Sequence, residues 1–234
     1  MAVIARVSFT QSSRPHQRLL MVGLPWGADQ EVFGCIGWHS MIQEFAEFYA
    51  RYGTARAVAE AVNGQPRFHG HGPYRFNESR TDFRFYLNHD VAYFRMVETA
   101  VPQAISQWYM GAGGTVGYHT ITGLAALYDL ITQREAGRVR FRVWPHESEH
   151  AMDLGNAHVL VESYPALYPK PASFGTCTTD DQRDAWKVLQ WMSAADKRGS
   201  LTEAFSPTPL RYGRVEGISF WEQVRFEGWI LGVS

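Results

Sequence analysis

Short apolar runs alternate with longer segments of helical periodicity along this chain, and this order limits the folds that it can adopt. Residues 17–24 (QRLLMVGL) and 158–165 (HVLVESYP) have the length and apolar content of buried strands. Residues 138–144 (RVRFRVW) alternate apolar side chains with arginines, which indicates a half-exposed strand near the edge of a sheet. Because strands alternate with helices, the sequence predicts an α/β fold with a mixed sheet flanked by helices.

Helical spacing of apolar residues predicts the elements that separate and follow these strands. A helix that begins at Ser40 as its N-cap is expected to end near Gly53. The other expected helices cover residues 54–63, a stretch around 90–109 that Pro102 interrupts, the segment after loop 111–117 as far as Gly137, and 180–199. Residues 226–233 predict a final strand or a docked tail.

The composition predicts one domain spanning residues 1–234. The two cysteines, Cys35 and Cys177, lie far apart, which excludes a disulfide framework and favours a reducing, cytoplasmic environment. No apolar run reaches the roughly 18 residues of a membrane span, so we expect no membrane partner. A net charge of −1 argues against coating of nucleic acid through bulk electrostatics, although it leaves room for a local basic groove.

Residues 65–110 are expected to form a long insertion, with arginine and aromatic side chains interleaved over residues 65–95. Loops of this length inside a compact domain are usually functional or disordered, and the aromatic content argues against disorder. Two interpretations remain open. The insertion stacks bases and holds phosphates, with Arg75, Arg80 and Arg84 as substrate-binding residues, or it packs as a cover over the sheet.

A glycine-rich loop at residues 111–117 leads into one of the expected helices. Backbone N–H groups at a helix N-terminus bind anions where glycines allow close approach, so Gly113 and Gly114 are candidate substrate-binding residues. The loop lacks the GKS/T of a P-loop and the spacing of a dinucleotide-binding fingerprint. A tightly packed turn is the favoured alternative.

The segment His146-Glu147-Ser148-Glu149-His150 fits the HExxH pattern of zinc peptidases. In that pattern two histidines one helical turn apart bind the metal, and the glutamate activates water. Here the segment follows a strand and Pro145, one middle position is charged, and no third ligand follows at a known spacing. These observations favour a solvated polar turn over a zinc site.

Acidic residues in two of the expected elements are candidates for chemistry. Glu162 lies within an apolar strand, where a carboxylate is costly unless it is paired, protonated or bound to metal. Asp180, Asp181 and Asp184 open the helix that follows, and aspartates at a helix start also complement the helix dipole. Glu162 and Asp184 are therefore the stronger catalytic candidates.

The order of these pieces resembles the family of uncharacterised bacterial proteins classed as predicted RNase H-like nucleases. The resemblance covers most of residues 19–233. Its most specific motifs are Glu162-Ser163-Tyr164-Pro165, Asp184-Ala185 and Glu227-Gly228-Trp229-Ile230-Leu231-Gly232.

The resemblance implies an RNase H-like mixed sheet and acidic residues that hold one or two divalent ions, Mg²⁺ or Mn²⁺, for phosphodiester cleavage. Glu162 matches the strand glutamate of the family and Asp184 its helix aspartate, and Asp181 joins them in the expected metal set. Nucleic acid or a nucleotide is the partner that follows.

The sequence departs from the family pattern at two acidic positions. Family members begin with a strand of the type GxD, which this sequence has lost or begins too late to include. A later family strand reads like GxDxPxGLP, whereas residues 22–27 read VGLPWG, with no acid at the expected place. The sequence therefore predicts a protein of RNase H-like fold that either cleaves phosphodiesters with a metal ion or has lost this activity. A non-catalytic nucleotide- or protein-binding module is the alternative.

Overall fold

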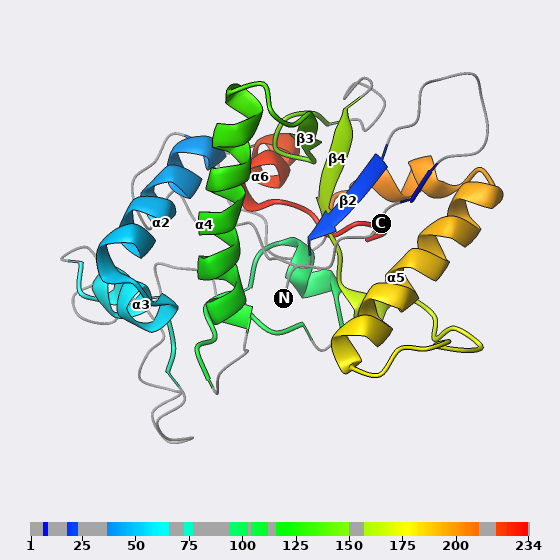
Figure 1. Ribbon diagram of the computed structural model, residues 1–234, viewed down its shortest axis with the longest axis horizontal. Helices are drawn as coiled ribbons and strands as arrows, with labels where there is room; N and C mark the ends of the chain where they lie inside the picture. Colours follow the sequence, from blue (N-terminus) through cyan, green and yellow to red (C-terminus); the bar gives the residue numbers. More distant parts are fainter. Residues whose placement is uncertain are drawn as a thin grey trace.

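The computed structural model describes residues 7–8, 18–22, 37–65, 73–76, 94–102, 104–111, 116–149, 157–210 and 219–233. The chain is an α/β protein, as expected (Figure 1). Its strands are β1 (Val7–Ser8), β2 (Arg18–Val22), β3 (Phe141–Val143) and β4 (His158–Glu162). Its α-helices are α2 (Trp38–Tyr52), α3 (Ala55–Asn63), α4 (Val116–Glu135), α5 (Asp180–Lys197) and α6 (Phe220–Glu227). Short 3₁₀ helices are η3 (Val97–Ala100), η5 (Pro165–Leu167) and η6 (Leu201–Phe205).

The four described strands form one mixed sheet in the order β1-β2-β4-β3. β1 pairs with β2 in antiparallel orientation, while β4 is parallel to both of its neighbours. Leu20 is in register with Leu160 on one side of β4, and Val143 with Leu160 on the other. The predicted mixed sheet is thus confirmed, and β3 lies at its edge among the described strands, as expected.

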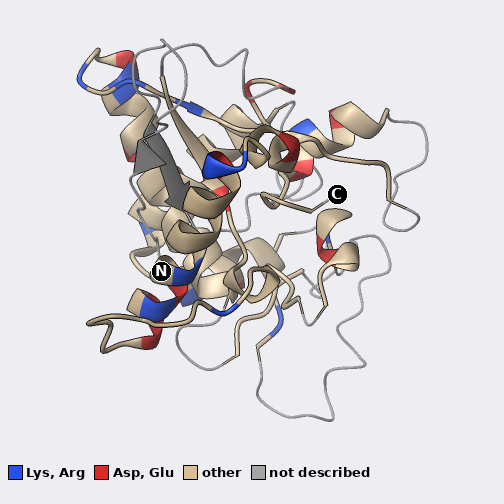
Figure 2. Ribbon diagram, turned by 90° about the vertical axis from the view of Figure 1, so that its right-hand side faces the viewer, with Lys and Arg blue, Asp and Glu red and all other residues tan. Residues whose placement is uncertain are grey.

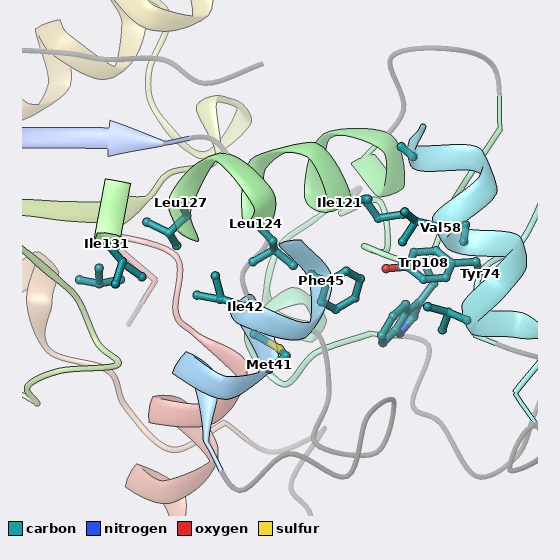
Figure 3. Packing of buried hydrophobic residues seen from close by; sticks show 14 of the residues in the cluster. Met41, Ile42, Phe45, Val58, Tyr74, Trp108, Ile121, Leu124, Leu127 and Ile131 are labelled. Atoms are coloured by element: carbon teal, nitrogen blue, oxygen red, sulfur yellow. The ribbon is translucent and has the colours of Figure 1, made fainter. Parts of the chain in front are cut away.

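β4 separates two hydrophobic cores, because its alternate side chains point to opposite faces of the sheet. Leu160 belongs to the first core, which α2, α3 and α4 build on one side (Figure 1). Figure 3 shows Met41, Ile42 and Phe45 of α2 packed along α4. Residues buried on both faces are typical of a central strand with parallel neighbours.

The second core lies on the other side of β4, where α5 covers the sheet (Figure 1). Val159 and Val161 contact this core, together with Val188 and Met192 of α5. The segment that follows α6 contributes Trp229, Ile230, Leu231 and Val233 to the same core.

Helix ends follow local sequence signals. α2 begins after Gly37, without the expected cap from Ser40, and ends at Gly53 in the left-handed conformation with φ of 74°. α5 and α6 each begin with a capping box, in which the side chains of Thr179 and Ser219 accept from the third helical N–H.

The structure corrects one expected element and decides between two alternatives for another. In the described part of the helix expected around 90–109, only η3 is helical: Arg95 and Glu98 make buried polar contacts there, and Pro102 follows. For residues 226–233, the docked tail is confirmed over the strand, and the tail follows the end of α6 at Glu227. The tail meets β4 through a single parallel bridge between Glu162 and Ile230.

Acidic and basic residues are interspersed along the described ribbon rather than gathered by sign on one face (Figure 2). Among the described residues, no helix combines the length and apolar character needed to cross a membrane.

Candidate functional site

A pocket of about 230 Å³ lies beside the carboxyl end of β4. The first residues of α4 and α5, the segment around η3 and the C-terminal tail complete its wall. Its buried part, the pocket floor, comprises Arg95, Glu98, Glu162, Ser163 and Ile230. Its exposed part, the pocket rim, comprises Ile105, Asp181 and Asp184. Ala104, Val116, His119, Tyr164 and Pro165 lie between them.

Arg95 and Glu162 form a bidentate ion pair on the pocket floor. Nη2 of Arg95 donates to Oε1 of Glu162 at 2.6 Å, and Nη1 donates to Oε2 at 2.8 Å. The side chains are only 2% and 6% exposed. Burial by itself lowers the pKa of Arg95, but the carboxylates of Glu162 and Glu98 outweigh this effect and raise it. Arg95 therefore stays charged, and both oxygens of Glu162 are occupied.

Two further carboxylates surround Arg95. Glu98 accepts from the Nε atom of Arg95 at 3.0 Å and from its backbone N–H. Glu227, at the end of α6, accepts from the backbone N–H of Met96 and from the side chain of Gln223. Burial raises the pKa of Glu227, and these hydrogen bonds partly offset the shift. The network thus ties η3 to β4 and to α6.

Asp181 and Asp184 lie in the first two turns of α5 and line the rim of the pocket. Thr179 caps the start of the helix, and Asp180 forms the ion pair with Arg183. Asp181 and Asp184 therefore provide neither the cap nor this ion pair. Partial burial raises the pKa of Asp184; Lys187 opposes this, and Asp181 and Asp180 add to it.

Ser163 follows Glu162 directly and is 4% exposed. Ser163 is part of the pocket floor, and its hydroxyl has no hydrogen-bond partner among the described residues. A buried hydroxyl without a partner costs about 1–3 kcal/mol, so such a group is a natural contact for a ligand.

The expected divalent-ion site does not fit these residues as they are arranged. Glu162, Asp181 and Asp184 do line one pocket, as the resemblance implies. Within the described ranges, however, no three acidic, histidine or cysteine side chains are close enough together to hold a metal ion. Glu162 is also engaged by Arg95 through both oxygens. Their role as metal ligands stays a prediction.

Of the expected phosphate-binding residues, only Arg75 is among those that the structure describes. Arg75 is 5% exposed and forms a β-bridge with Tyr109. Its backbone N–H donates to the carbonyl of Trp108, and its own carbonyl accepts from the backbone N–H of Met110. It does not line the pocket. Arg80, Arg84, Gly113 and Gly114 lie outside the described residues.

The HExxH segment forms a turn after β3 in its described part, residues 146–149, and not a helix. The Nδ1 atom of His146 lies 2.6 Å from the carbonyl oxygen of Arg225, and its ring stacks on Trp38. Glu147 accepts from Arg134 and from the backbone N–H of Val143. The helical geometry of a zinc peptidase is therefore absent here, and the favoured turn is confirmed, although His146 is buried rather than solvated.

Sequence reasoning missed three residues of the site: Arg95, Glu98 and Ser163. Arg95 and Glu98 have the i, i+3 spacing of a helical ion pair, which is a weak local signal. Ser163 carries no signal of its own, because only the fold shows that its hydroxyl has no partner.

No family model, no curated protein and no solved structure matches this chain. The described geometry defines it as an α/β protein with a partly open acidic pocket at the carboxyl end of its central strand.

Proposed function

We propose that this chain is a non-catalytic ligand-binding protein on an RNase H-like sheet, and that its pocket binds a small molecule without a metal ion. The observation that carries the proposal is the ion pair between Arg95 and Glu162. In the nucleases that the chain resembles, the strand glutamate is expected to hold a metal ion. Here a permanently charged guanidinium fills the same role towards the carboxylate.

The energetics of the pair favour binding over metal-dependent catalysis. Guanidinium and carboxylate match each other in bidentate geometry, and a pair removed from water is difficult to separate without a replacement partner. A metal ion would have to displace Arg95, which Glu98 also holds in place. The pocket floor is therefore preorganised, which reduces the entropy cost of binding a ligand.

The pocket itself has the mixed character of a small-molecule site. Charged groups on its floor and rim are accompanied by apolar side chains from Ile105, Val116 and Pro165. Such combinations of apolar lining with a few polar groups are typical of ligand sites. The volume of about 230 Å³ suits a small metabolite or one end of a larger molecule.

The proposal is tested with Mg²⁺ and with small fragments in separate experiments. Protein thermal stability is measured with 10 mM Mg²⁺ or Mn²⁺ and in EDTA, and cleavage is assayed on single- and double-stranded DNA and RNA. We expect no metal-induced rise in Tm and no cleavage. In EDTA, a fragment set of amines, alcohols, carboxylates and nucleosides is expected to shift the NMR signals of Ser163 and Ile105. Failure of every fragment in EDTA would overturn the proposal.

A metal-dependent nuclease is the second candidate. The observation in its favour is that Glu162, Asp181 and Asp184 line one pocket. It requires Glu162 to leave Arg95, so Mg²⁺ should then stabilise the protein and Glu162→Gln should abolish that stabilisation. Mg²⁺-dependent cleavage that Asp184→Asn removes would establish this candidate over the first.

A further inference from the structure

We infer that the ligand of this pocket is a small organic cation, an alkylammonium or guanidinium compound whose chain is short and apolar. This inference rests on the proposed function, since it specifies the molecule that the pocket binds. It assigns the positive group to the rim carboxylates of Asp181 and Asp184 and a second N–H donor to the hydroxyl of Ser163.

The described lining of the pocket carries more negative than positive charge. Four carboxylates line the pocket, from Glu98, Glu162, Asp181 and Asp184, against one guanidinium, from Arg95. That guanidinium is already shared between Glu98 and Glu162 on the floor. Among the described lining residues, no cation remains to balance the negative charge of the rim, and Lys187 on α5 acts on Asp184 from outside this lining. Such a wall attracts cations and repels phosphates and carboxylates.

The hydroxyl of Ser163 independently indicates a ligand that carries an N–H donor. Ser163 belongs to the pocket floor, and its buried hydroxyl has no hydrogen-bond partner among the described residues. A hydroxyl oxygen accepts from an ammonium or guanidinium N–H, since those groups only donate. A ligand donor at this position would complete the one pocket-floor polar group that the described protein leaves unsatisfied.

The apolar part of the lining favours an organic cation over a bare metal ion. Ile105 is 47% exposed on the rim, and one other large hydrophobic residue of the described chain, Tyr52, is exposed to a similar degree. Burying Ile105 under an alkyl chain would stabilise the complex. A divalent ion gains nothing from this surface and needs six or more oxygen ligands instead.

The test uses three probes of equal length: putrescine, 1,4-butanediol and succinate, which are dicationic, neutral and dianionic. Binding to the full chain is measured by calorimetry and NMR in EDTA. We expect putrescine to bind, with NMR shifts centred on Ser163 and Ile105, and the diol to bind roughly tenfold more weakly or not at all. Succinate should not bind.

Variants locate the binding. Asp184→Asn should weaken putrescine binding roughly tenfold, and Ser163→Ala should weaken it to a smaller degree. Asp196→Asn is the matched control, because Asp196 lies on the same helix away from the pocket lining, and it should change the affinity less than twofold. Circular dichroism checks that each variant is folded.

The outcomes separate this inference from the proposed function. If the diol or succinate binds in EDTA as tightly as putrescine, the cationic inference fails while the proposed function stands. If putrescine shifts signals evenly over acidic surfaces and Asp184→Asn has no effect, the inference also fails. If no probe or fragment binds in EDTA, both fail together.

Discussion

The guanidinium of Arg95 and the carboxylate of Glu162 meet in two short hydrogen bonds, although 67 residues separate them in the chain. Arg95 precedes η3, and Glu162 ends β4. The pair therefore joins a segment without regular structure to the central strand of the sheet. Since both side chains are almost fully buried, neither can turn to water when its partner is removed.

Arg95→Met is expected to lower the free energy of unfolding by about 3–5 kcal/mol, because it leaves the carboxylates of Glu162 and Glu98 buried without a cation. Urea unfolding measures the change. Arg183→Met is the control: Arg183 forms an exposed pair with Asp180, so its loss should cost less than about 1 kcal/mol.

A double variant tests the coupling. Arg95→Met combined with Glu162→Leu should cost clearly less than the two single changes added together, since the unpaired carboxylate at position 162 is gone. If the losses in the free energy of unfolding simply add, Arg95 and Glu162 are not coupled, which contradicts the ion pair on the pocket floor.

Most regular elements could be predicted because their signals are local. The helical spacing in 40–53 and the capping residues before α5 act over a few residues, and so does the alternation in β3. The segment around η3 could not be predicted. Its conformation depends on Glu162 and Glu227, which lie far away in the chain. Residues 220–227 form a helix because Ser219 and Glu222 cap it, a signal that the apolar tail obscured.

His146 is expected to make the protein less stable in mild acid. Burial lowers its pKa to about 4, and the positive charges of Arg95 and Arg225 add to the effect. An unfolded histidine titrates near 6.5, so the unfolded chain takes up a proton at a higher pH than the folded chain does. Stability is complete above about pH 6.5 and falls as the pH drops towards 4, by up to about 3 kcal/mol.

The measurement compares urea unfolding of the wild type and His146→Phe between pH 4 and pH 7. Carboxylates titrate over part of this range in both proteins, so the difference between them isolates the histidine. His39→Phe is the control, because the side chain of His39 is 44% exposed. Equal pH dependence in the wild type and His146→Phe would contradict the prediction.

Gly232→Ala is expected to loosen the C-terminal tail. Gly232 has φ of 84°, and a Cβ atom would lie 3.2 Å from the ring of Trp191. That ring stacks on Tyr168, whose hydroxyl donates to Leu231, so it has little freedom to move. We expect a loss of about 2–3 kcal/mol in the free energy of unfolding.

Gly137→Ala is the matched control for this change. Gly137 has φ of 73°, but nothing lies within 4 Å of its Cβ position. It should therefore show the backbone strain alone, about 1 kcal/mol. Equal losses for the two substitutions would show that contact with Trp191 has no effect.

Glu147→Gln is expected to destabilise the turn after β3 without any effect on metal content. Glu147 accepts from Arg134 and Val143, so the change weakens charge-assisted hydrogen bonds by about 1–3 kcal/mol. Elemental analysis of protein purified without chelator should find far less than one zinc per chain in the wild type and the variant. Stoichiometric zinc that Glu147→Gln retains and His146→Phe loses would revive the peptidase hypothesis.

The acidic side of the pocket could be predicted from the sequence, and its basic partner could not. Glu162 drew attention because a carboxylate in an apolar strand needs a reason. That reason is Arg95, which the sequence placed among the arginines of the insertion with nothing to distinguish it. Pairing between residues so far apart is a property of the folded chain, and the arginine content alone does not show it.

The pocket floor also determines when the site can form during folding. Arg95 contacts Glu162 and the carbonyl of Glu227, which follow it by 67 and 132 residues. Contacts over such separations close large loops and are entropically costly until most of the chain is in place. During synthesis from the N-terminus, Arg95 is therefore made long before Glu162 and Glu227. The binding site is one of the last parts of this protein to come into existence, and its assembly reports that the whole described fold has closed.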